Sequence, residues 1–271
     1  MFASNLHTHT RFSDGQNTME DMVLTAIAKG FVSLGISDHA PLAHDDYSAM
    51  KPDLLPPYRA EFVRLREKYQ GQIQLYLGLE WDSLAPSFDR TGLDYVIGSV
   101  HDMRDEAGRA HPLDWNTEKF DEALNCIAHG DIQVLVWQYY LQLIQMLHLH
   151  KPDILGHMNI IEKMNTDDRY FSPQVPWYRD ICTATADAIA KTGCIVEVNT
   201  ALNKLRPGSC YPSPELLALL HKREVPVTIS SDAHQSDHLD FHFTQAVQLL
   251  KDVGYRQVKM LRNNSFVDIS L

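Results

Sequence analysis

Short apolar segments that each end in a histidine or a carboxylate recur along this chain of 271 residues. The first is residues 2–6, followed at once by His7-Thr8-His9. Alternate side chains of a strand point to the same face, so two imidazoles at this spacing can bind one metal ion. One such pair is weak evidence, but the layout returns at further strand ends. These later residues are Asp38-His39, Glu80, His101, His157 and Asp232-Ala233-His234. The recurrence indicates a metalloenzyme.

Segments rich in Ile, Val and Leu alternate with longer amphipathic segments, which predicts a repeated strand–helix order. The predicted strands are residues 2–6, 33–37, 73–79, 95–100, 154–156, 195–198 and 227–230. The predicted helices are residues 19–29, 57–69, 117–128, 135–150, 178–192, 214–222 and 243–253. This alternation favours an α/β fold closed into a barrel. An open doubly wound sheet is the alternative, but no G-x-G-x-x-G follows the first strand.

Barrel enzymes place their chemistry at the carboxyl ends of the strands, where every candidate donor here lies. The chain length suits one barrel domain that spans residues 1–271. Glu80 ends the apolar run 75–79, and a carboxylate without a partner would be costly there. Each histidine alone could be an ordinary packed residue. Taken together, the donors would have to gather on one rim by coincidence, so we interpret them as metal ligands.

The net charge is −11 with neutral histidines, so nucleic acid and anionic lipid are disfavoured as partners. This charge would also repel an anionic substrate unless bound cations reverse it locally. The four cysteines form no C-x-x-C pair and are expected to be reduced thiols. The first residues lack the pattern of a signal peptide, and the apolar run 134–147 is too short and too polar to span a membrane. We therefore expect a soluble, cytoplasmic protein.

The ordered motifs H-x-H, D-H, G-L-E, S-V-H, G-H and S-D-A-H resemble those of the PHP (polymerase and histidinol phosphatase) superfamily. The resemblance runs from Asn5 to His234. Asn199-Thr200, Tyr211-Pro212-Ser213 and Trp115 resemble the histidinol-phosphate phosphatase branch. The resemblance implies a distorted TIM-like (β/α)7 barrel that holds a trinuclear metal centre.

The resemblance also implies how the donors would be shared among three divalent transition-metal ions. His7, His9, Glu80 and Asp232 would hold the first ion. His101 and His157 would hold the second, with Glu80 as a bridge, and Asp14, His39 and His234 would hold the third. Mixed imidazole and carboxylate ligands suit zinc, manganese or iron and disfavour magnesium or calcium. The sequence specifies neither which of these metals is bound nor the oligomeric state.

Three divalent ions would outweigh the three carboxylates of Asp14, Glu80 and Asp232, so the site would be cationic within an acidic protein. Such a site suits a phosphate ester, and metals about 3.5–4 Å apart can clamp phosphoryl oxygens and activate a bridging water. We hypothesise that metal-bound hydroxide attacks a phosphate monoester, with Asp232 and His234 as the catalytic residues that manage protons.

Substrate contacts are expected from residues around the motifs. Arg206 lies where the family carries a phosphate-binding arginine and could make a bidentate contact. Lys163 is a second candidate for the phosphate, although Glu162 occupies a neighbouring position where the branch usually has a basic residue. Asn199 and Trp115 complete the predicted substrate-binding residues.

The leading interpretation is a phosphomonoesterase of histidine biosynthesis that converts L-histidinol phosphate to L-histidinol and phosphate. A PHP phosphoesterase acting on another small ester is the first alternative: a sugar phosphate, a nucleotide phosphate or a diester. A non-catalytic PHP module is the second, but such modules lose ligands and none of the donor positions is lost here. An amidohydrolase is the third, and the three-metal ligand set and Arg206 speak against it.

Overall fold

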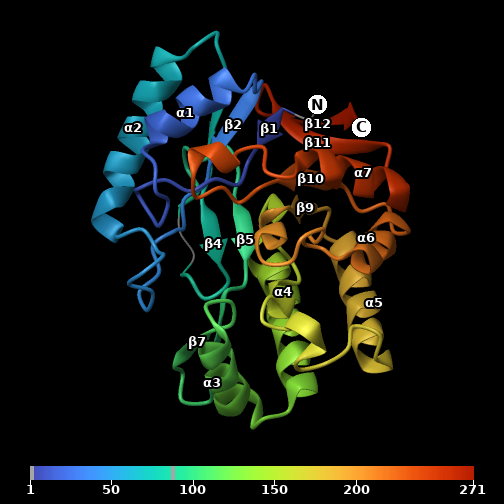
Figure 1. Ribbon diagram of the computed structural model, residues 1–271. Coiled ribbons are helices and arrows are strands. Elements are labelled where there is room, and N and C mark those ends of the chain that lie inside the picture. The colour runs from blue at the N-terminus through green and yellow to red at the C-terminus, as the bar shows by residue number, and fades with distance from the viewer. Residues whose placement is uncertain (1–2, 87–88) are drawn as a thin grey trace.

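Parallel strands and helices alternate along the computed structural model, which describes residues 3–86 and 89–271 (Figure 1). The strands are β1 (Ser4–Asn5), β2 (Ser33–Ile36), β3 (Gln74–Leu77), β4 (Glu80–Asp82), β5 (Ile97–Ser99), β6 (Asp102–Arg104), β7 (Ala110–Pro112), β8 (Ile154–Leu155), β9 (Ile195–Asn199), β10 (Val227–Ser230), β11 (Gln257–Arg262) and β12 (Ser265–Ser270). The helices are α1 (Met19–Ala28), α2 (Leu55–Lys68), α3 (Thr117–Ala128), α4 (Ile132–His150), α5 (Pro176–Ala190), α6 (Pro214–His221) and α7 (Phe243–Val253). The predicted α/β class is confirmed.

Two parallel sheets carry the candidate donors. One has the strand order β1-β2-β3, and the other has the order β10-β9-β8-β5-β4. Isolated parallel bridges join the sheets on both sides, Thr8 with Ala233 and His39 with Glu80. Thr8, Ala233 and His39 follow the carboxyl ends of β1, β10 and β2, and Glu80 follows β3 as the first residue of β4. Segments far apart in the sequence therefore meet there.

Side-chain caps fix where several helices begin. Thr18 caps α1, as the sequence predicts, because its hydroxyl accepts a hydrogen bond from the Asp21 amide while the Asp21 carboxylate accepts one from the Thr18 amide. Asn116 caps α3 and Asp131 caps α4, and each side chain accepts a hydrogen bond from a backbone amide of the first turn. These caps set the lengths of the loops that precede the helices, and the loop before Asn116 borders the candidate site.

The structure differs from the predicted elements in two hairpins. The insert after His101 forms the antiparallel pair β6–β7, and the chain ends in the antiparallel pair β11–β12. The predicted strand 73–79 divides into β3 and the segment that leads to β4. Of the predicted strand 2–6, the structure has β1, while the start of that prediction lies outside the described residues.

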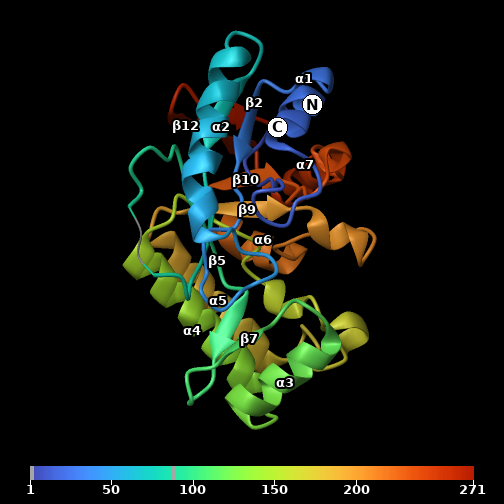
Figure 2. The same ribbon diagram turned by 90° about the vertical axis from the view of Figure 1, so that its left-hand side faces the viewer.

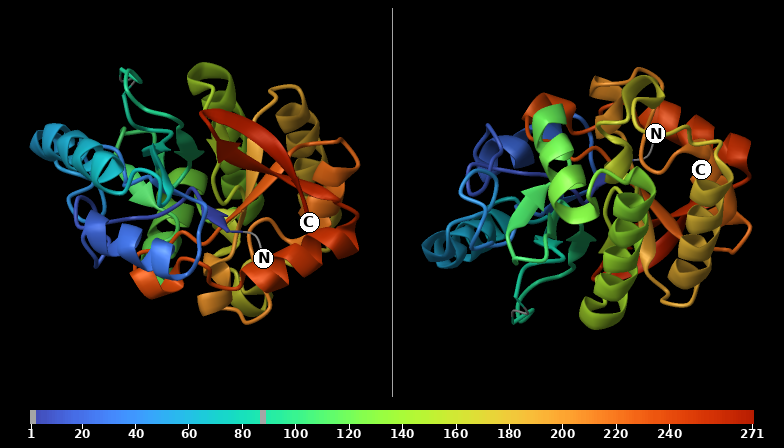
Figure 3. Two further views of the ribbon diagram at one scale, coloured as in Figure 1. Left: turned by 90° about the horizontal axis from the view of Figure 1, so that it is seen from above. Right: turned by 90° about the horizontal axis from the view of Figure 1, so that it is seen from below.

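The two ends of the strands have opposite character. The β11–β12 hairpin lies across one end of the fold (Figure 3), where Leu261 is buried with Leu6, Ile97, Ile154 and Ile195. At the opposite end lie β7 and α3 (Figure 2), together with the polar strand-end residues. Burial of apolar side chains at one end stabilises the strands, and the polar side chains at the other end form the candidate site. No helix among residues 3–86 and 89–271 is long and apolar enough to cross a membrane.

Candidate metal centre

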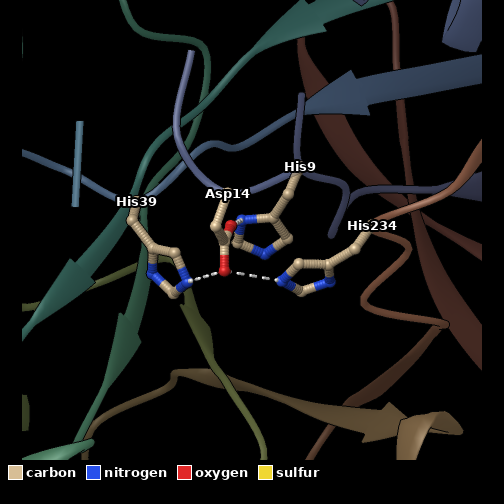
Figure 4. A group of neighbouring side chains, drawn as sticks. All are labelled: His9, Asp14, His39 and His234. Atoms are coloured by element: carbon tan, nitrogen blue, oxygen red, sulfur yellow. Dashed lines mark hydrogen bonds and ion pairs between the residues drawn. The ribbon is translucent and has the colours of Figure 1, made fainter. Parts of the chain in front are cut away.

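Nine histidine and carboxylate side chains converge at the carboxyl ends of the strands. They form overlapping groups whose ligand atoms lie within 4.8 Å of one another, and each group could hold a metal ion. The groups are His9, Asp14, His39 and His234; His7, His157 and Asp232; His7, His9 and Glu80; and His39, Glu80 and His101. Figure 4 shows the first group, in which the three imidazoles surround the carboxylate of Asp14. The structure therefore brings together all nine residues predicted as ligands.

Glu80 lies at the centre of the cluster, and its two carboxylate oxygens face different histidines. Oε1 lies 2.9 Å from Nε2 of His157 and 3.3 Å from Nε2 of His101. Oε2 lies 3.1 Å from Nε2 of His7 and 3.0 Å from Nδ1 of His39. A carboxylate whose two oxygens face separate pairs of imidazoles could bridge two metal ions. This is the role that the family resemblance implies for Glu80.

Asp232 and His234 reach the cluster through a left-handed turn of the backbone. Asp232 has φ of 50°, a conformation that non-glycine residues rarely adopt and that costs about 1 kcal/mol or more. The turn directs Oδ1 of Asp232 to 3.1 Å from Nε2 of His9, and Nε2 of His234 to 3.1 Å from Oδ2 of Asp14. Strain at such a position is typical of functional sites.

A buried carboxylate that is not itself a predicted ligand holds the loop with Asp14 in place. Asp38 accepts hydrogen bonds from the amide and the hydroxyl of Thr10 and from those of Ser13. Gly15 is required for the same turn, because a Cβ there would lie 2.4 Å from the backbone of His9. The loop therefore crosses tightly over the first strand end and presents Asp14 to the cluster.

Two further carboxylates orient the histidines and were not predicted. Oε1 of Glu197 lies 2.6 Å from Nδ1 of His7, and Oε2 accepts hydrogen bonds from the amides of His157 and Asn199. Asp82 accepts a hydrogen bond from the backbone of His101 and lies 3.3 Å from its Nδ1. Carboxylates in these positions fix the ring and tautomer of a metal-binding histidine. The signal for Glu197 was a charge inside the apolar strand segment 195–198, the same logic that identified Glu80.

Several buried polar atoms of the cluster have no hydrogen-bond partner. They are Nε2 of His7, both ring nitrogens of His9, Nδ1 of His157 and Oδ1 of Asp232. Leaving such atoms unpaired is costly, and their neighbours lie close but are not aligned as hydrogen bonds. Buried ligand atoms that lie close together without hydrogen bonds fit divalent cations. The donor set of imidazoles and carboxylates fits zinc, manganese or iron.

Electrostatics within the cluster keeps its carboxylates ionised. Burial alone would raise the pKa of Glu80, but the imidazoles around it, His7 foremost, hold that pKa well below its usual range. Burial alone would lower the pKa of His7, but the carboxylates of Glu197 and Asp232 raise it well above its usual value. For His9, burial and neighbouring imidazoles together lower the pKa to about 4. Ionised carboxylates and a neutral imidazole such as that of His9 are the forms that bind metal ions, whereas His7 would lose its proton on binding one.

A cavity of about 740 Å³ opens over the cluster, and lysines, carboxylates and aromatic rings form its walls. Of the predicted substrate-binding residues, Lys163 and Trp115 line this cavity. Lys204 and Tyr211 also line it, and neither was predicted to contact the substrate. The hydroxyl of Tyr211 is buried without a hydrogen-bond partner. The cavity thus offers cations and a free hydroxyl beside the candidate metal ligands.

Arg206 and Asn199 do not line the cavity. The guanidinium of Arg206 turns toward the neighbouring loop and donates hydrogen bonds to the backbone carbonyls of Glu162 and Lys163. Asn199 is fully buried, where its amide donates to Glu197 and lies 3.3 Å from Oδ2 of Asp232. In this structure both residues hold other parts of the site in position, Arg206 through Nη2 and Asn199 through its side-chain amide.

The fold and the cluster together define an α/β protein with a candidate multinuclear metal centre. The chain belongs to the PHP domain family, whose model matches residues 5–201. A protein of Deinococcus radiodurans named probable histidinol-phosphatase is 28% identical over 263 residues, which cover 93% of this chain and 94% of that protein. The histidinol-phosphatase of Bacillus subtilis is 28% identical over 260 residues, 88% of this chain and 95% of that protein.

A solved structure has the same fold. The histidinol phosphate phosphatase of Lactococcus lactis, complexed with zinc, L-histidinol and phosphate, superposes with a TM-score of 0.71 at 18% identity. The match covers 97% of this chain and 98% of that chain.

Proposed function

We propose that this protein is a metal-dependent phosphomonoesterase that hydrolyses L-histidinol phosphate to L-histidinol and phosphate. The observation that carries the proposal is the convergence of nine metal-binding side chains under a cavity lined by Lys163 and Lys204. Two similar proteins are named histidinol-phosphatase or probable histidinol-phosphatase, and the Lactococcus lactis relative binds zinc, L-histidinol and phosphate. The reaction belongs to histidine biosynthesis.

We propose that the cluster holds three divalent transition-metal ions. His9, Asp14, His39 and His234 form one complete set of donors, and the remaining donors surround the two oxygens of Glu80. Bound there, divalent ions would neutralise the phosphoryl oxygens and make a water nucleophilic near neutral pH. Glu197 keeps His7 in the ring orientation that such binding needs.

The chain's own residues then bind and orient the ester. Lys163 and Lys204 are two of the three lysines that line the cavity, and we assign them to the phosphate in place of Arg206. Arg206 instead holds the backbone that carries Lys163. The free hydroxyl of Tyr211 can donate a hydrogen bond to an oxygen of the bound ester.

Asp232 and His234 both line the cavity and are the groups to which we assign proton handling. Nδ1 of His234 lies 3.5 Å from Oδ1 of Asp232, so the two side chains can act on the same side of a bound ester. Their shared turn holds them together through the reaction.

We further propose that the strands close into a distorted (β/α)7 barrel and that residues 1–271 form one domain. The parallel bridges between Thr8 and Ala233 and between His39 and Glu80 support closure, since they join the two sheets on both sides. The free thiols of the four cysteines support a location in the cytoplasm. The acidic net charge supports a small-molecule substrate rather than nucleic acid.

A turnover screen on metal-replete protein tests the proposed function. It compares kcat/KM for L-histidinol phosphate with that for p-nitrophenyl phosphate, a sugar phosphate and a nucleoside monophosphate. We expect L-histidinol phosphate to exceed each of the others by about tenfold or more, the effect of one or two extra specific contacts. If p-nitrophenyl phosphate is hydrolysed equally well, the histidinol assignment fails and the phosphatase class stands. If no ester is hydrolysed, the phosphatase class fails as well.

A further inference from the structure

Two segments meet over the mouth of the cavity. One is the loop of residues 41–51, which follows β2, and the other is the insert of residues 102–116, which contains β6 and β7 (Figure 2). Nε2 of His44 lies 3.1 Å from Oδ2 of Asp102. Further out, the rings of Tyr47 and Trp115 contact each other with centroids 5.7 Å apart. The contact between these two aromatic side chains thus joins two segments that are distant in the sequence.

Hydrogen bonds to the backbone hold the two segments that carry these rings. Asp45 accepts hydrogen bonds from the amides of Tyr47, Ser48 and Ala49, which form a turn in this part of the loop. On the other side, Trp115 directly precedes the cap of α3. The two rings contact each other and remain exposed, Tyr47 by 82% and Trp115 by 57%.

Exposed apolar side chains gather at this mouth. Among the described residues, nine large hydrophobic side chains are exposed, and Tyr47, Trp115 and Leu205 line the one cavity above the metal-binding residues. Keeping large apolar surface in water costs free energy that a bound ligand can recover. An aromatic side chain gains additional free energy when it contacts another flat ring in a stacked or edge-to-face arrangement.

The inner end of this mouth adjoins the proposed phosphate site. Asp114 precedes Trp115 in the chain, and its Oδ2 lies 2.9 Å from Nζ of Lys163. The carboxylates of Asp45 and Asp102 line the same cavity, where Asp45 accepts hydrogen bonds from backbone amides and Asp102 pairs with His44. The cavity therefore presents the proposed phosphate site, several carboxylates and an aromatic pair.

We propose that Tyr47 and Trp115 bind the flat ring of the substrate's alcohol and so select phosphate monoesters whose alcohol carries an aromatic or heteroaromatic ring. The inference rests on the proposed function, because it assumes that the ester is hydrolysed at the cluster. It goes further in assigning the recognition of the leaving group to two mouth residues from separate segments.

Single substitutions measured on two esters test this proposal. Tyr47→Ala and Trp115→Ala should each raise KM for L-histidinol phosphate about 3- to 10-fold, the size of one aromatic ring contact, with kcat changed less than twofold. Phosphoethanolamine has the amine but no ring, so the ratio of kcat/KM between the two esters should fall by the same factor. Trp137→Ala is the matched control, since Trp137 is 52% exposed on α4 and does not line the cavity.

A binding measurement gives a second readout that does not depend on turnover. Titration with L-histidinol should change the tryptophan emission of the wild type and of Trp137→Phe, and Trp115→Phe should lose this change. If Tyr47→Ala and Trp115→Ala lower kcat/KM equally for both esters, or leave the ratio of the two values unchanged, the proposed selection of an aromatic ring is wrong. The proposed phosphatase activity would still stand. Absence of L-histidinol phosphate turnover in the wild type would overturn the proposed function and this inference together.

Discussion

Glu197 shows how much of the site depends on residues that need not touch a metal ion. Its two oxygens contact the ring of His7, the backbone of His157 and the side chain of Asn199. It is fully buried, as is His7, so this pair is shielded from solvent. The carboxylate therefore connects three strand ends, and its loss should disturb the geometry of several donors at once.

Glu197→Gln should weaken metal binding about 10- to 100-fold, because an amide places a donor where the histidine ring and the amides need an acceptor. Metal content after dialysis, measured by elemental analysis, should fall, and excess metal should restore turnover. Glu215→Gln, on the first turn of α6, is the matched control and should behave as wild type. Normal metal content in Glu197→Gln would contradict the positioning role.

Tyr211→Phe separates function from stability. The hydroxyl is buried without a partner, so its removal should leave the free energy of unfolding unchanged or slightly higher. If it donates to the bound ester, kcat/KM should fall about 3- to 10-fold, which corresponds to one hydrogen bond of ~1 kcal/mol. Thermal unfolding and steady-state kinetics on the same preparation check both parts. Unchanged kinetics would remove Tyr211 from the substrate site.

At the residue scale, the sequence could predict the donors but not every substrate contact. Eight of the nine predicted ligands follow an apolar strand, and parallel strand ends meet in space, so the pattern brings these donors together. Asp14 lies in the loop after the first strand, and only the family resemblance predicted it as a ligand. No sequence pattern predicts the direction of a side chain in a short 3-10 turn. Lys204 is the last residue of the turn Ala201–Lys204 and lines the cavity, whereas Arg206 lies beyond the turn and does not. The sequence could not distinguish these two residues.

At the element scale, the alternation of strands and helices predicted the order of the parallel core, and both added hairpins were missed. The β11–β12 hairpin carries a signal that could have identified it. Asn263 and Asn264 form its two-residue turn and both have positive φ, the conformation that asparagine tolerates best after glycine. The insert with β6 and β7 has no alternation strong enough to predict its pairing, because its strands have only three residues each.

The hairpin's contribution is stability rather than catalysis. Leu261→Ala should lower the free energy of unfolding by about 2–4 kcal/mol, because Leu261 is 2% exposed within the apolar end of the strands. KM for L-histidinol phosphate should not change, since the substitution lies at the end opposite the cavity. Denaturant unfolding and kinetics test this, with the exposed Leu24→Ala as the control that should lose less than about 0.5 kcal/mol. A large change in KM would show that the two ends are coupled.

At the scale of the whole molecule, bound metal ions would decide the sign of the charge at the site. The net charge is −11, and the cavity over the donors is lined by three lysines and by seven carboxylates: Lys119, Lys163 and Lys204, with Asp14, Asp45, Glu80, Asp82, Asp102, Asp114 and Asp232. Divalent ions at the nine donors would offset these carboxylates and suit the cavity to a phosphate ester. Apolar packing at one end of the strands stabilises a fold that places the donors at the other end.

An anomalous-scattering map from crystals grown with zinc or manganese tests the central claim most directly. The account predicts three peaks within the cluster, each coordinated by imidazole nitrogens or carboxylate oxygens from His7, His9, Asp14, His39, Glu80, His101, His157, Asp232 and His234. A map with no peak among these side chains, or with the bound metal held elsewhere, would contradict it.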